Sequence, residues 1–428
     1  MNKNKSWGNY PKVKNQKTIS YSEGFSFTES NYLSIGLGRS YGDVGLNEEG
    51  TLISTHNLNK IISFNEINGI INCESGLSIK EILNFIIPKG WFLPVVPGTR
   101  NVTIGGAIAN DIHGKNHHVD GTFGNYIKSM RLLRSDGVIL NCSNEENTKY
   151  FDASIAGLGL TGIILSAELQ LKKITSEYID VETFKYKSLD EYWKINSYCE
   201  EKYDYTVSWV DCLYNKKNDL RGVYLAGNHS KKLIKRKSKR EINITFPLTP
   251  PFSFVNNFSM RIINQFYYTL NKTTKESVQH YKKFFFPLDV INNWNKAYGR
   301  NGFFQYQFVV PKENGPETLD KVLEIIKRKN QVPALGVLKN FGSIKSPGLM
   351  SFPFEGVTLA LDFPNKGEKT KSLFKELNKI IFDNNGRIYP AKDALMQAKE
   401  FQNSYPELDN FTKYIDPKFS SSFWRRVN

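Results

Sequence analysis

The sequence contains no uninterrupted apolar run long enough to cross a bilayer, which takes about 20 residues. Residues 1–17 include several lysines but no apolar core, so we expect no secretory signal peptide. We expect the first ten or so residues, which are polar, to be loose. These observations predict a cytoplasmic protein, or one held peripherally at the inner membrane, without a transmembrane helix.

Cysteine is scarce. The four cysteines, Cys73, Cys142, Cys199 and Cys212, are far apart in the chain and form no CxxC pair. This spacing excludes the common zinc and thiol-redox motifs, and we expect no metal site. Reduced, buried thiols are the simplest expectation for cysteines so widely dispersed.

Acidic residues are also in the minority, since 42 Asp and Glu oppose 57 Lys and Arg and give a net charge of +15. This excess favours an anionic partner such as nucleic acid, acidic lipid or a phosphorylated substrate. A nucleic-acid-binding role would be supported by charge alone, because the sequence contains no recognition motif. We therefore expect no nucleic-acid partner. Residues 231–240 hold seven cations, and aromatic residues follow from Phe246 to Tyr268. This arrangement predicts a peripheral contact with an anionic membrane as readily as it predicts a solvated loop.

With 428 residues, the chain is longer than one ordinary domain, and its texture changes after Lys173. We expect a domain over 1–176, a second over 177–386, and a return to the first over 387–428. Periodicity and capping signals predict the following elements: a helix opened by Ser78–Glu81 and stopped by Pro88–Gly90, a hairpin over 132–140, a half-buried strand over 165–171, strands over 303–310 and 357–363, and helices over 319–326 and 373–381, the last ending at Asn385-Gly386.

Two glycine-rich stretches, Gly36–Asp43 and Pro97–His118, are the most informative feature of the chain. Glycine weakens helices and strands by roughly 0.5–1 kcal/mol, so such runs usually mark backbone that a ligand approaches closely. Together they predict a large anionic cofactor held by backbone N–H groups. A third glycine-rich stretch, over 157–162, matches the GxGxxG pattern. It precedes a strand rather than a helix, so it predicts a turn and no nicotinamide site.

Polar residues also alternate along two expected strands. Gln305 and Gln307 are two residues apart and therefore face the same side of a strand. Lys339 shares a face with apolar neighbours, so it needs a counter-charge, such as a substrate phosphate, or has a lowered pKa. A lysine directed off an edge strand is the alternative.

The segments GLGRSYGD, PGTRNVTIGGAIANDIHGKNHH and GLTGII resemble the flavin-binding landmarks of the vanillyl-alcohol-oxidase superfamily. Within it, HGKNHH and the segments 294–299, 304–308 and 389–393 are similar to the branch of decaprenylphosphoryl-β-D-ribose 2-oxidases, from about residue 30 to the end. The resemblance implies an α+β fold, with a PCMH-type FAD-binding domain and a separate α+β substrate domain built on an antiparallel sheet.

The resemblance also implies the cofactor, which is FAD. The positions that match the family's FAD contacts are Gly36, Gly38, Arg39, Ser40, Tyr41, Gly42, Gly98, Thr103, Ile104, Gly105, Gly106, Asn110, Asp111, Ile112, His113, Ile164 and Tyr389. Several relatives attach flavin covalently through a histidine, and Arg39 stands at that position here. Arginine cannot form this bond, so we expect non-covalent FAD.

By the same resemblance, Lys392 and His113 are the candidate catalytic residues. Lys392 would activate or orient the reacting hydroxyl, although a histidine such as His113 is, by itself, more often a satisfied core residue. The implied substrate-binding residues are Lys115, Gln305, Gln307, Lys339, Trp209, Tyr41 and Phe285, with Tyr298 a weaker candidate. Three positions depart from the family: Phe285 replaces a tyrosine, Ala360 a cysteine and Thr358 an asparagine.

The implied activity is the FAD-dependent oxidation of the 2′-hydroxyl of a polyprenyl-phosphoryl ribose to a 2′-keto sugar. A separate NAD(P)H-dependent short-chain reductase would then complete the epimerisation to the arabinose used in cell-envelope polysaccharide. Two alternatives remain open at this point. One is an oxidase of a soluble alditol or sugar lactone, and the other is a flavoprotein without turnover that acts as a partner at a membrane surface.

Overall fold

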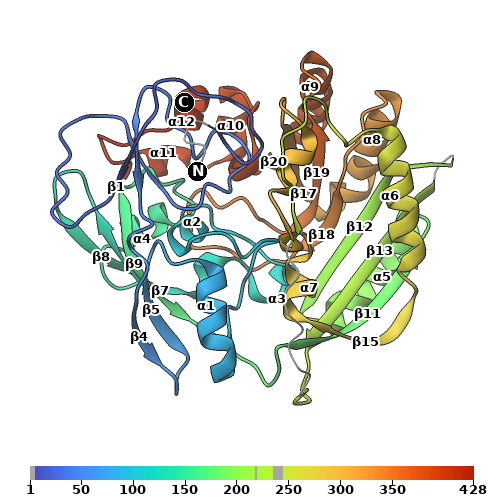
Figure 1. The fold of residues 1–428 in the computed structure, drawn as a ribbon, viewed down its shortest axis with the longest axis horizontal. Helices are drawn as coiled ribbons and strands as arrows, with labels where there is room; N and C mark the ends of the chain where they lie inside the picture. Colours follow the sequence, from blue (N-terminus) through green and yellow to red (C-terminus); the bar gives the residue numbers. More distant parts are fainter. Residues whose placement is uncertain (1–4, 217–218, 235–243) are drawn as a thin grey trace.

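The computed structural model describes residues 5–216, 219–234 and 244–428, and the fold is α+β (Figure 1). A five-stranded antiparallel sheet organises much of the first 176 residues, with a small three-stranded parallel sheet beside it. In spatial order, the larger sheet contains β4 (Ile61–Asn65), β5 (Ile70–Glu74), β9 (Ile163–Gln170), β7 (Ile127–Leu133) and β8 (Ile139–Ser143), and the smaller contains β1 (Lys17–Ser20), β3 (Thr51–Ser54) and β2 (Tyr32–Ile35).

The helices and short strands associated with this part of the chain are α1 (Ile79–Ile86), η1 (Ile87–Lys89), β6 (Trp91–Phe92), α2 (Ile104–Ala109), α3 (His117–Asp120), η2 (Phe123–Tyr126), α4 (Thr148–Ser154) and β10 (Lys172–Lys173). Helix α1 shows why the sequence folds as it does. Ser78 caps its first turn, Glu81 bonds back to the Ser78 amide, and Gly90 takes a left-handed conformation after the helix, as the sequence predicts.

An eight-stranded sheet, antiparallel throughout, dominates the rest of the molecule (Figure 1). In spatial order, its strands are β15 (Thr274–His280), β11 (Tyr178–Tyr186), β13 (Asp219–His229), β12 (Tyr205–Lys216), β18 (Gly336–Phe341), β19 (Gly356–Pro364), β17 (Phe303–Pro311) and β20 (Arg387–Ile388).

One face of this sheet packs against α5 (Leu189–Lys202), α8 (Gly315–Arg328) and α9 (Glu368–Asp383), and α6 (Asn257–Leu270) lies over β12 on the other face. Tyr306 points to the α9 side, where its hydroxyl donates to Asn378. The remaining elements are β14 (Ile244–Thr245), α7 (Tyr281–Phe285), η3 (Pro287–Val290), β16 (Ile291–Asn292), η4 (Trp294–Tyr298), η5 (Lys312–Asn314) and η6 (Pro390–Lys392).

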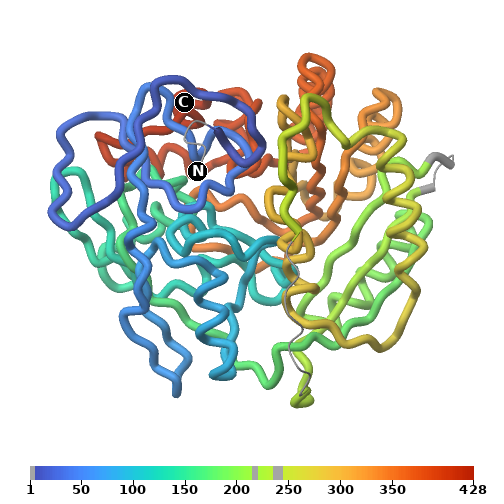
Figure 2. Tube along the Cα trace, in the orientation of Figure 1, coloured from blue at the N-terminus to red at the C-terminus, as the bar shows by residue number. Residues whose placement is uncertain are grey.

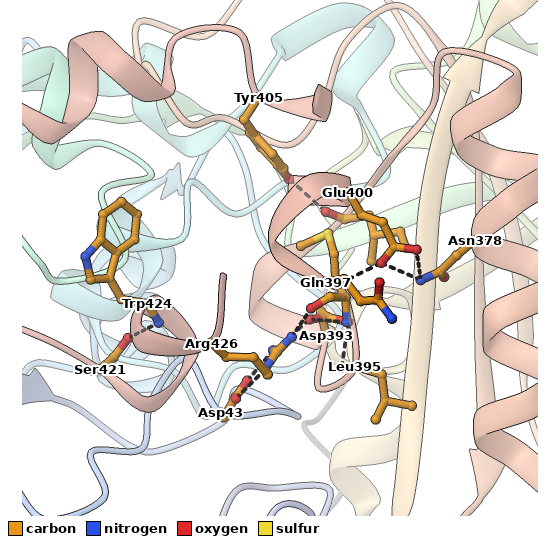
Figure 3. A network of polar contacts seen from close by, with 12 residues as sticks. Asp43, Asn378, Asp393, Leu395, Gln397, Glu400, Tyr405, Ser421, Trp424 and Arg426 are labelled. Atoms are coloured by element: carbon orange, nitrogen blue, oxygen red, sulfur yellow. Dashed lines mark hydrogen bonds and ion pairs between the residues drawn. The ribbon is translucent and has the colours of Figure 1, made fainter. Parts of the chain in front are cut away.

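The chain returns at its end to the amino-terminal part, where α10 (Ala398–Ser404), α11 (Leu408–Thr412) and α12 (Ser422–Val427) lie next to the first strands (Figure 2). Arg426 binds Asp43 at 2.7 Å and Asp393 at 2.8 Å, and the Asp393 carboxylate also accepts from the Leu395 amide (Figure 3). This network fixes the first glycine-rich segment against the segment that contains Lys392.

The predicted hairpin, the strands β17 and β19 and the helices α8 and α9 are confirmed. Three expectations need correction. Strand β9 is central and mostly buried rather than half-buried, because its residues pack into two different hydrophobic clusters. After α9 the left-handed residue is Asn385 rather than glycine, and Gly386 instead permits a close approach to Ile381.

The third correction concerns the amino end, which is not loose in the residues described. The Trp7 amide donates to the Ser40 carbonyl oxygen at 3.0 Å, and the Phe303 amide donates to that of Gly8 at 2.8 Å. The Trp7 ring also packs edge-on against Trp294. Much of the basic run over 231–240 lies outside the described residues. The four cysteines are buried and form no disulfide bond, as expected.

Candidate active site

A cavity of about 1300 Å³ lies between the two glycine-rich segments and one face of the eight-stranded sheet. Strands β12, β17 and β18 supply one wall of the cavity. Tyr389 and Lys392, from the carboxy-terminal part of the chain, also line it. The predicted cofactor contacts that line it are Gly36, Gly38, Arg39, Ser40, Tyr41, Gly98, Thr103, Gly105, Gly106, Asn110, Ile112, His113, Ile164 and Tyr389.

Three residues of the implied cofactor set do not line the cavity. The Asp111 carboxylate accepts hydrogen bonds from Ser346 and Ser351, which makes it a structural residue beneath the segment. Ile104 is fully buried in the core. Gly42 instead permits a close backbone contact, since a Cβ there would lie 1.5 Å from the Asp393 carbonyl oxygen.

The first glycine-rich segment has the features of an anion cradle. The amides of residues 37–40 make no hydrogen bond to any residue the structure describes. A Cβ at Gly36 would lie 2.1 Å from Thr103 Oγ1, so only glycine lets the two segments meet. The Arg39 guanidinium lies 4.0 Å above the Trp7 ring and faces the same cavity. Free amides beside a cation suit a diphosphate.

Unpartnered polar atoms show that the cavity is built for a polar ligand. Within the described ranges, the buried side-chain atoms without a hydrogen-bond partner include five on lining residues: Arg39 Nε, Ser75 Oγ, Asn110 Oδ1, Gln305 Oε1 and Gln307 Oε1. An unpaired buried polar group costs about 1–3 kcal/mol, so such atoms gather where a ligand completes their bonds. The cavity therefore fits a dinucleotide that carries a polar ring system.

The sheet wall agrees with the sequence prediction. Gln305 and Gln307 both face the cavity, and Lys339 faces it from β18. Strand β18 lies between β12 and β19, so the edge-strand interpretation of Lys339 is wrong. Lys339 is instead half-buried on an interior strand and faces the cavity.

A directional hydrogen-bond chain fixes the His113 ring. The Thr358 hydroxyl donates to the Phe308 carbonyl oxygen at 2.7 Å, which leaves Oγ1 as an acceptor. Gln307 Nε2 donates to this oxygen at 3.0 Å and also lies 3.1 Å from His113 Nε2. As an amide nitrogen it donates to both, so His113 Nε2 is an acceptor. Burial keeps the pKa of His113 well below its ordinary value, and the single proton of the neutral ring therefore lies on Nδ1.

The other ring nitrogen faces Lys339. Its Nζ lies 3.2 Å from His113 Nδ1 and donates to the Gly114 carbonyl oxygen at 2.9 Å. The neutral amine form of Lys339 can accept a hydrogen bond from this nitrogen. Burial, together with the nearby charges of Lys392 and Lys115, lowers the pKa of Lys339 well below its ordinary value.

Two more lysines share this wall. Burial lowers the pKa of Lys115 to about 7, and its Nζ donates to the Phe284 carbonyl oxygen. Burial also lowers the pKa of Lys392 to about 8, against the opposing effect of the Asp362 carboxylate. Three enclosed amines around one cavity leave it short of negative charge, so an anionic ligand would raise all three pKa values.

The Asp362 carboxylate opposes the effect of burial on Lys392. Burial raises the pKa of its carboxyl to about 6, and Gln305 Nε2 donates to it at 2.5 Å. The Asp362 carboxylate and the Lys392 ammonium stabilise each other's charged form, because each lies in the field of the opposite charge. The sequence contains no signal for Asp362, because its place opposite Gln305 follows from the register of β17 with β19.

The remaining substrate candidates lie around the same space. Trp209, Tyr41 and Phe285 line the cavity, and the ring centroids of Trp209 and Tyr267 are 4.7 Å apart. Tyr298 does not line it and stacks on Phe303 at 4.1 Å. Further lining residues that the sequence did not single out are Ser75, Leu158, Asn264 and Tyr267, whereas Gly159 and Thr161 line the cavity and belong to the GLTGII segment.

The turn expected at 157–162 is confirmed, with Leu158 and Gly159 both in the left-handed region. The glycines of this turn are the sequence feature that indicates its place at the cavity. No group of three or more metal-ligating side chains occurs in the part of the chain that the structure describes. Among the same residues, no helix is both long and apolar enough to span a membrane.

The chain is similar to several known proteins. The FAD binding domain family matches residues 28–143. The decaprenylphosphoryl-β-D-ribose oxidase of Mycolicibacterium smegmatis is 35% identical over 407 residues, which cover 92% of this chain and 88% of that protein. An uncharacterized protein of Streptomyces coelicolor is 26% identical over 82% of this chain and 100% of its own length. The L-gulonolactone oxidase of Mus musculus is 26% identical over only 32% of this chain.

Proposed function

Because the chain belongs to the family of decaprenylphosphoryl-β-D-ribose oxidases and is an FAD-dependent oxidoreductase, we propose that it oxidises the 2′-hydroxyl of a polyprenyl-phosphoryl ribose. The product is the corresponding 2′-keto sugar. The observation that carries this proposal is the set of three enclosed lysines opposite the glycine-rich cradle in one cavity.

The cavity residues divide between cofactor and substrate. The free amides of residues 37–40 and the Arg39 guanidinium would hold the diphosphate of FAD, and Asn110 and Gln307 have unpaired acceptor atoms for its polar ring edge. Bound FAD supplies the acceptor for the hydride taken from the alcohol carbon. No histidine occurs in residues 36–43, and Arg39 forms no flavin bond, so the cofactor is held without a covalent link.

Lys392 is proposed as the base. Oxidising a secondary alcohol removes a proton from oxygen as well as a hydride from carbon, so a neutral acceptor must face the hydroxyl. The lowered pKa of Lys392 provides a neutral amine at mildly alkaline pH. Lys115 and Lys339 are proposed to take the substrate phosphoryl group, whose negative charge would stabilise their protonated forms.

His113 is proposed to orient the substrate rather than to take its proton. Its pKa lies well below the ordinary value, and its ring is held on both sides by Gln307 and Lys339. A ring fixed in this way is a rigid wall beside the reacting sugar.

We further propose that residues 1–176 and 387–428 form the FAD-binding domain and that residues 177–386 form the substrate domain. The Arg426 bridge to Asp43 and Asp393 supports the return of the chain end. An NAD(P)H-dependent short-chain reductase as partner and a peripheral membrane contact complete the proposal. The comparisons support this activity over a soluble lactone substrate, since the match to a lactone oxidase covers only 32% of the chain.

The test is product identification. The purified protein is incubated with a prenyl-phosphoryl ribose that carries deuterium at C2 and with a dye as electron acceptor. The proposal expects a product that has lost that deuterium and reacts with a carbonyl reagent. A carbonyl product that retains the deuterium, or recovery of unchanged ribose, would overturn it.

A further inference from the structure

Helix α6 presents its apolar side chains outward. Its buried side chains are Met260 and Asn264, whereas Phe258, Ile262, Phe266 and Leu270 are 76%, 56%, 65% and 63% exposed. These four residues recur at every fourth position and therefore form one stripe along the helix. A helix on the surface of a soluble domain normally turns such a stripe to the core. In α6 the apolar stripe faces away from the protein instead.

A buried polar anchor fixes this orientation. Asn264 Nδ2 donates to Asp211 Oδ1 at 2.6 Å, and Asp211 is paired with Arg221 at 2.7 Å. Arg221 in turn donates to Gln265 on the same helix at 2.9 Å. Turning α6 over would strip a buried ion pair of its partners, which is strongly unfavourable. The outward stripe is thus a property of the folded chain.

The stripe extends into neighbouring segments. We call the whole set the apolar rim: Ile244, Leu248, Phe252, Phe254, Phe258, Ile262, Ile263, Phe266, Leu270, Val290 and Ile291. Strand pairing of Ile244 with Ile291 and a hydrogen bond from Ser259 Oγ to the Phe254 carbonyl oxygen connect its parts. More than half of the exposed large apolar side chains in the described residues fall between Ile244 and Ile291.

The apolar rim borders the opening of the active-site cavity. Ile263, Phe266, Leu270 and Ile291 line the cavity and are also exposed, so they mark where it meets the exterior. Figure 1 shows α6 at the right of the view, beside β12 and β13 of the eight-stranded sheet.

The segment that carries α6 and most of the apolar rim has charge of one sign, and the first acid after it is the exposed Glu276. From Ile244 to Lys275 the sequence contains no Asp or Glu, and Arg261, Lys272 and Lys275 are exposed. Lys283, also exposed, lines the cavity. Exposed aromatic and aliphatic side chains flanked by cations and free of acids complement an anionic lipid surface.

We propose that the apolar rim inserts into an anionic lipid bilayer and that the cavity thereby opens into the headgroup layer. A lipid-linked sugar would then pass from the bilayer into the cavity between α6 and residues 288–291, its apolar chain remaining against the rim. The identity of that lipid rests on the proposed function, whereas the insertion of the rim does not.

The test uses flotation with vesicles of phosphatidylglycerol and phosphatidylcholine in equal parts. The holoprotein should float with these vesicles. The double variant Phe258→Glu/Ile262→Glu changes two outward side chains that do not line the cavity, and its vesicle binding should fall by more than about tenfold. Ile67 is an exposed isoleucine at the β4–β5 turn, outside the apolar rim. The control variant Ile67→Glu should leave vesicle binding unchanged.

Insertion is measured separately from charge attraction. Tryptophan at Ile262→Trp should be quenched by vesicles that contain brominated phosphatidylcholine, and tryptophan at Ile67→Trp should show no added quenching. The proposal is overturned if the wild-type protein does not float, if the double variant floats equally well, or if Ile262→Trp is not quenched. It is also overturned if light scattering shows a dimer that the double variant dissociates, because the rim would then be an interface between two copies.

A short-chain, water-soluble prenyl-phosphoryl ribose separates this inference from the proposed function. The double variant should reduce its flavin with this substrate at the wild-type rate, and much more slowly with the long-chain substrate embedded in vesicles. Failure of both proteins with the soluble substrate would overturn the proposed function while leaving the flotation result intact.

Discussion

Lys339 Nζ lies 3.2 Å from His113 Nδ1, although the two residues are 226 positions apart in the chain. The donor and acceptor pattern on the other side of the ring favours a neutral imidazole whose proton is on Nδ1, the nitrogen that faces the amine. A bound phosphoryl group would favour a protonated Lys339, and this would change the contact with His113, because a protonated amine can only donate.

The first prediction concerns Thr358, whose hydroxyl orients the Gln307 amide. Thr358→Val keeps the shape and removes the hydroxyl, at a net cost of about 1 kcal/mol for one hydrogen bond. The rate of flavin reduction should fall by roughly fivefold to tenfold. Thr358→Ser keeps the hydroxyl and should restore most of the rate. Equal rates in Thr358→Val and the wild type would show that the chain does not position His113.

The second prediction concerns pH. A base must be neutral, and burial lowers the pKa of Lys392 to about 8. Activity, measured as kcat/KM, should therefore be low below that pH and rise as pH increases through it. The Asp362 carboxylate raises the pKa of Lys392, so Asp362→Asn should move the rise to lower pH while keeping the acceptor for Gln305. A rise that stays in place or moves to higher pH would contradict the assignment.

The third prediction concerns how FAD is held. Acid precipitation of the yellow protein should leave the colour in the supernatant, because Arg39 stands where a covalent attachment would need histidine. Mass spectrometry of the denatured chain should give the mass of the unmodified polypeptide. Flavin that stays with the pellet after washing would refute this expectation.

The fourth prediction concerns the bridge from Arg426 to Asp43 and Asp393. Arg426→Ala leaves two largely buried carboxylates without their partner, and removing one member of such a group costs about 3–5 kcal/mol. The melting temperature and the temperature of flavin release should both drop. Lys371→Ala, which removes an exposed pair with Glu368, should leave both unchanged. Equal effects of the two variants would contradict a structural role for the bridge.

Local chemistry could be predicted from the sequence where neighbouring residues determine it. The capping box at Ser78 and Glu81 forms as expected, and Gln305 and Gln307 face one side because strand alternation requires it. The cavity lining near the amino end likewise follows from the glycine-rich segments, since few other residues permit such close contacts.

What could not be predicted depends on distant partners. The environment of Lys339 follows from the position of β18 inside the sheet, which periodicity does not reveal. The outward turn of α6 is set by Asp211, a residue on another element, against the preference of its own apolar stripe. The role of Asp362 required knowing that it lies opposite Gln305. In each case, tertiary contacts override the local pattern.

Anaerobic mixing of the purified flavoprotein with a prenyl-phosphoryl ribose, followed by the visible absorption of the flavin, tests the central claim most directly. The account predicts that the wild-type protein bleaches and that Lys392→Ala retains its FAD but does not bleach. Bleaching of Lys392→Ala at the wild-type rate, or a wild-type flavin that stays oxidised with this substrate, would contradict it.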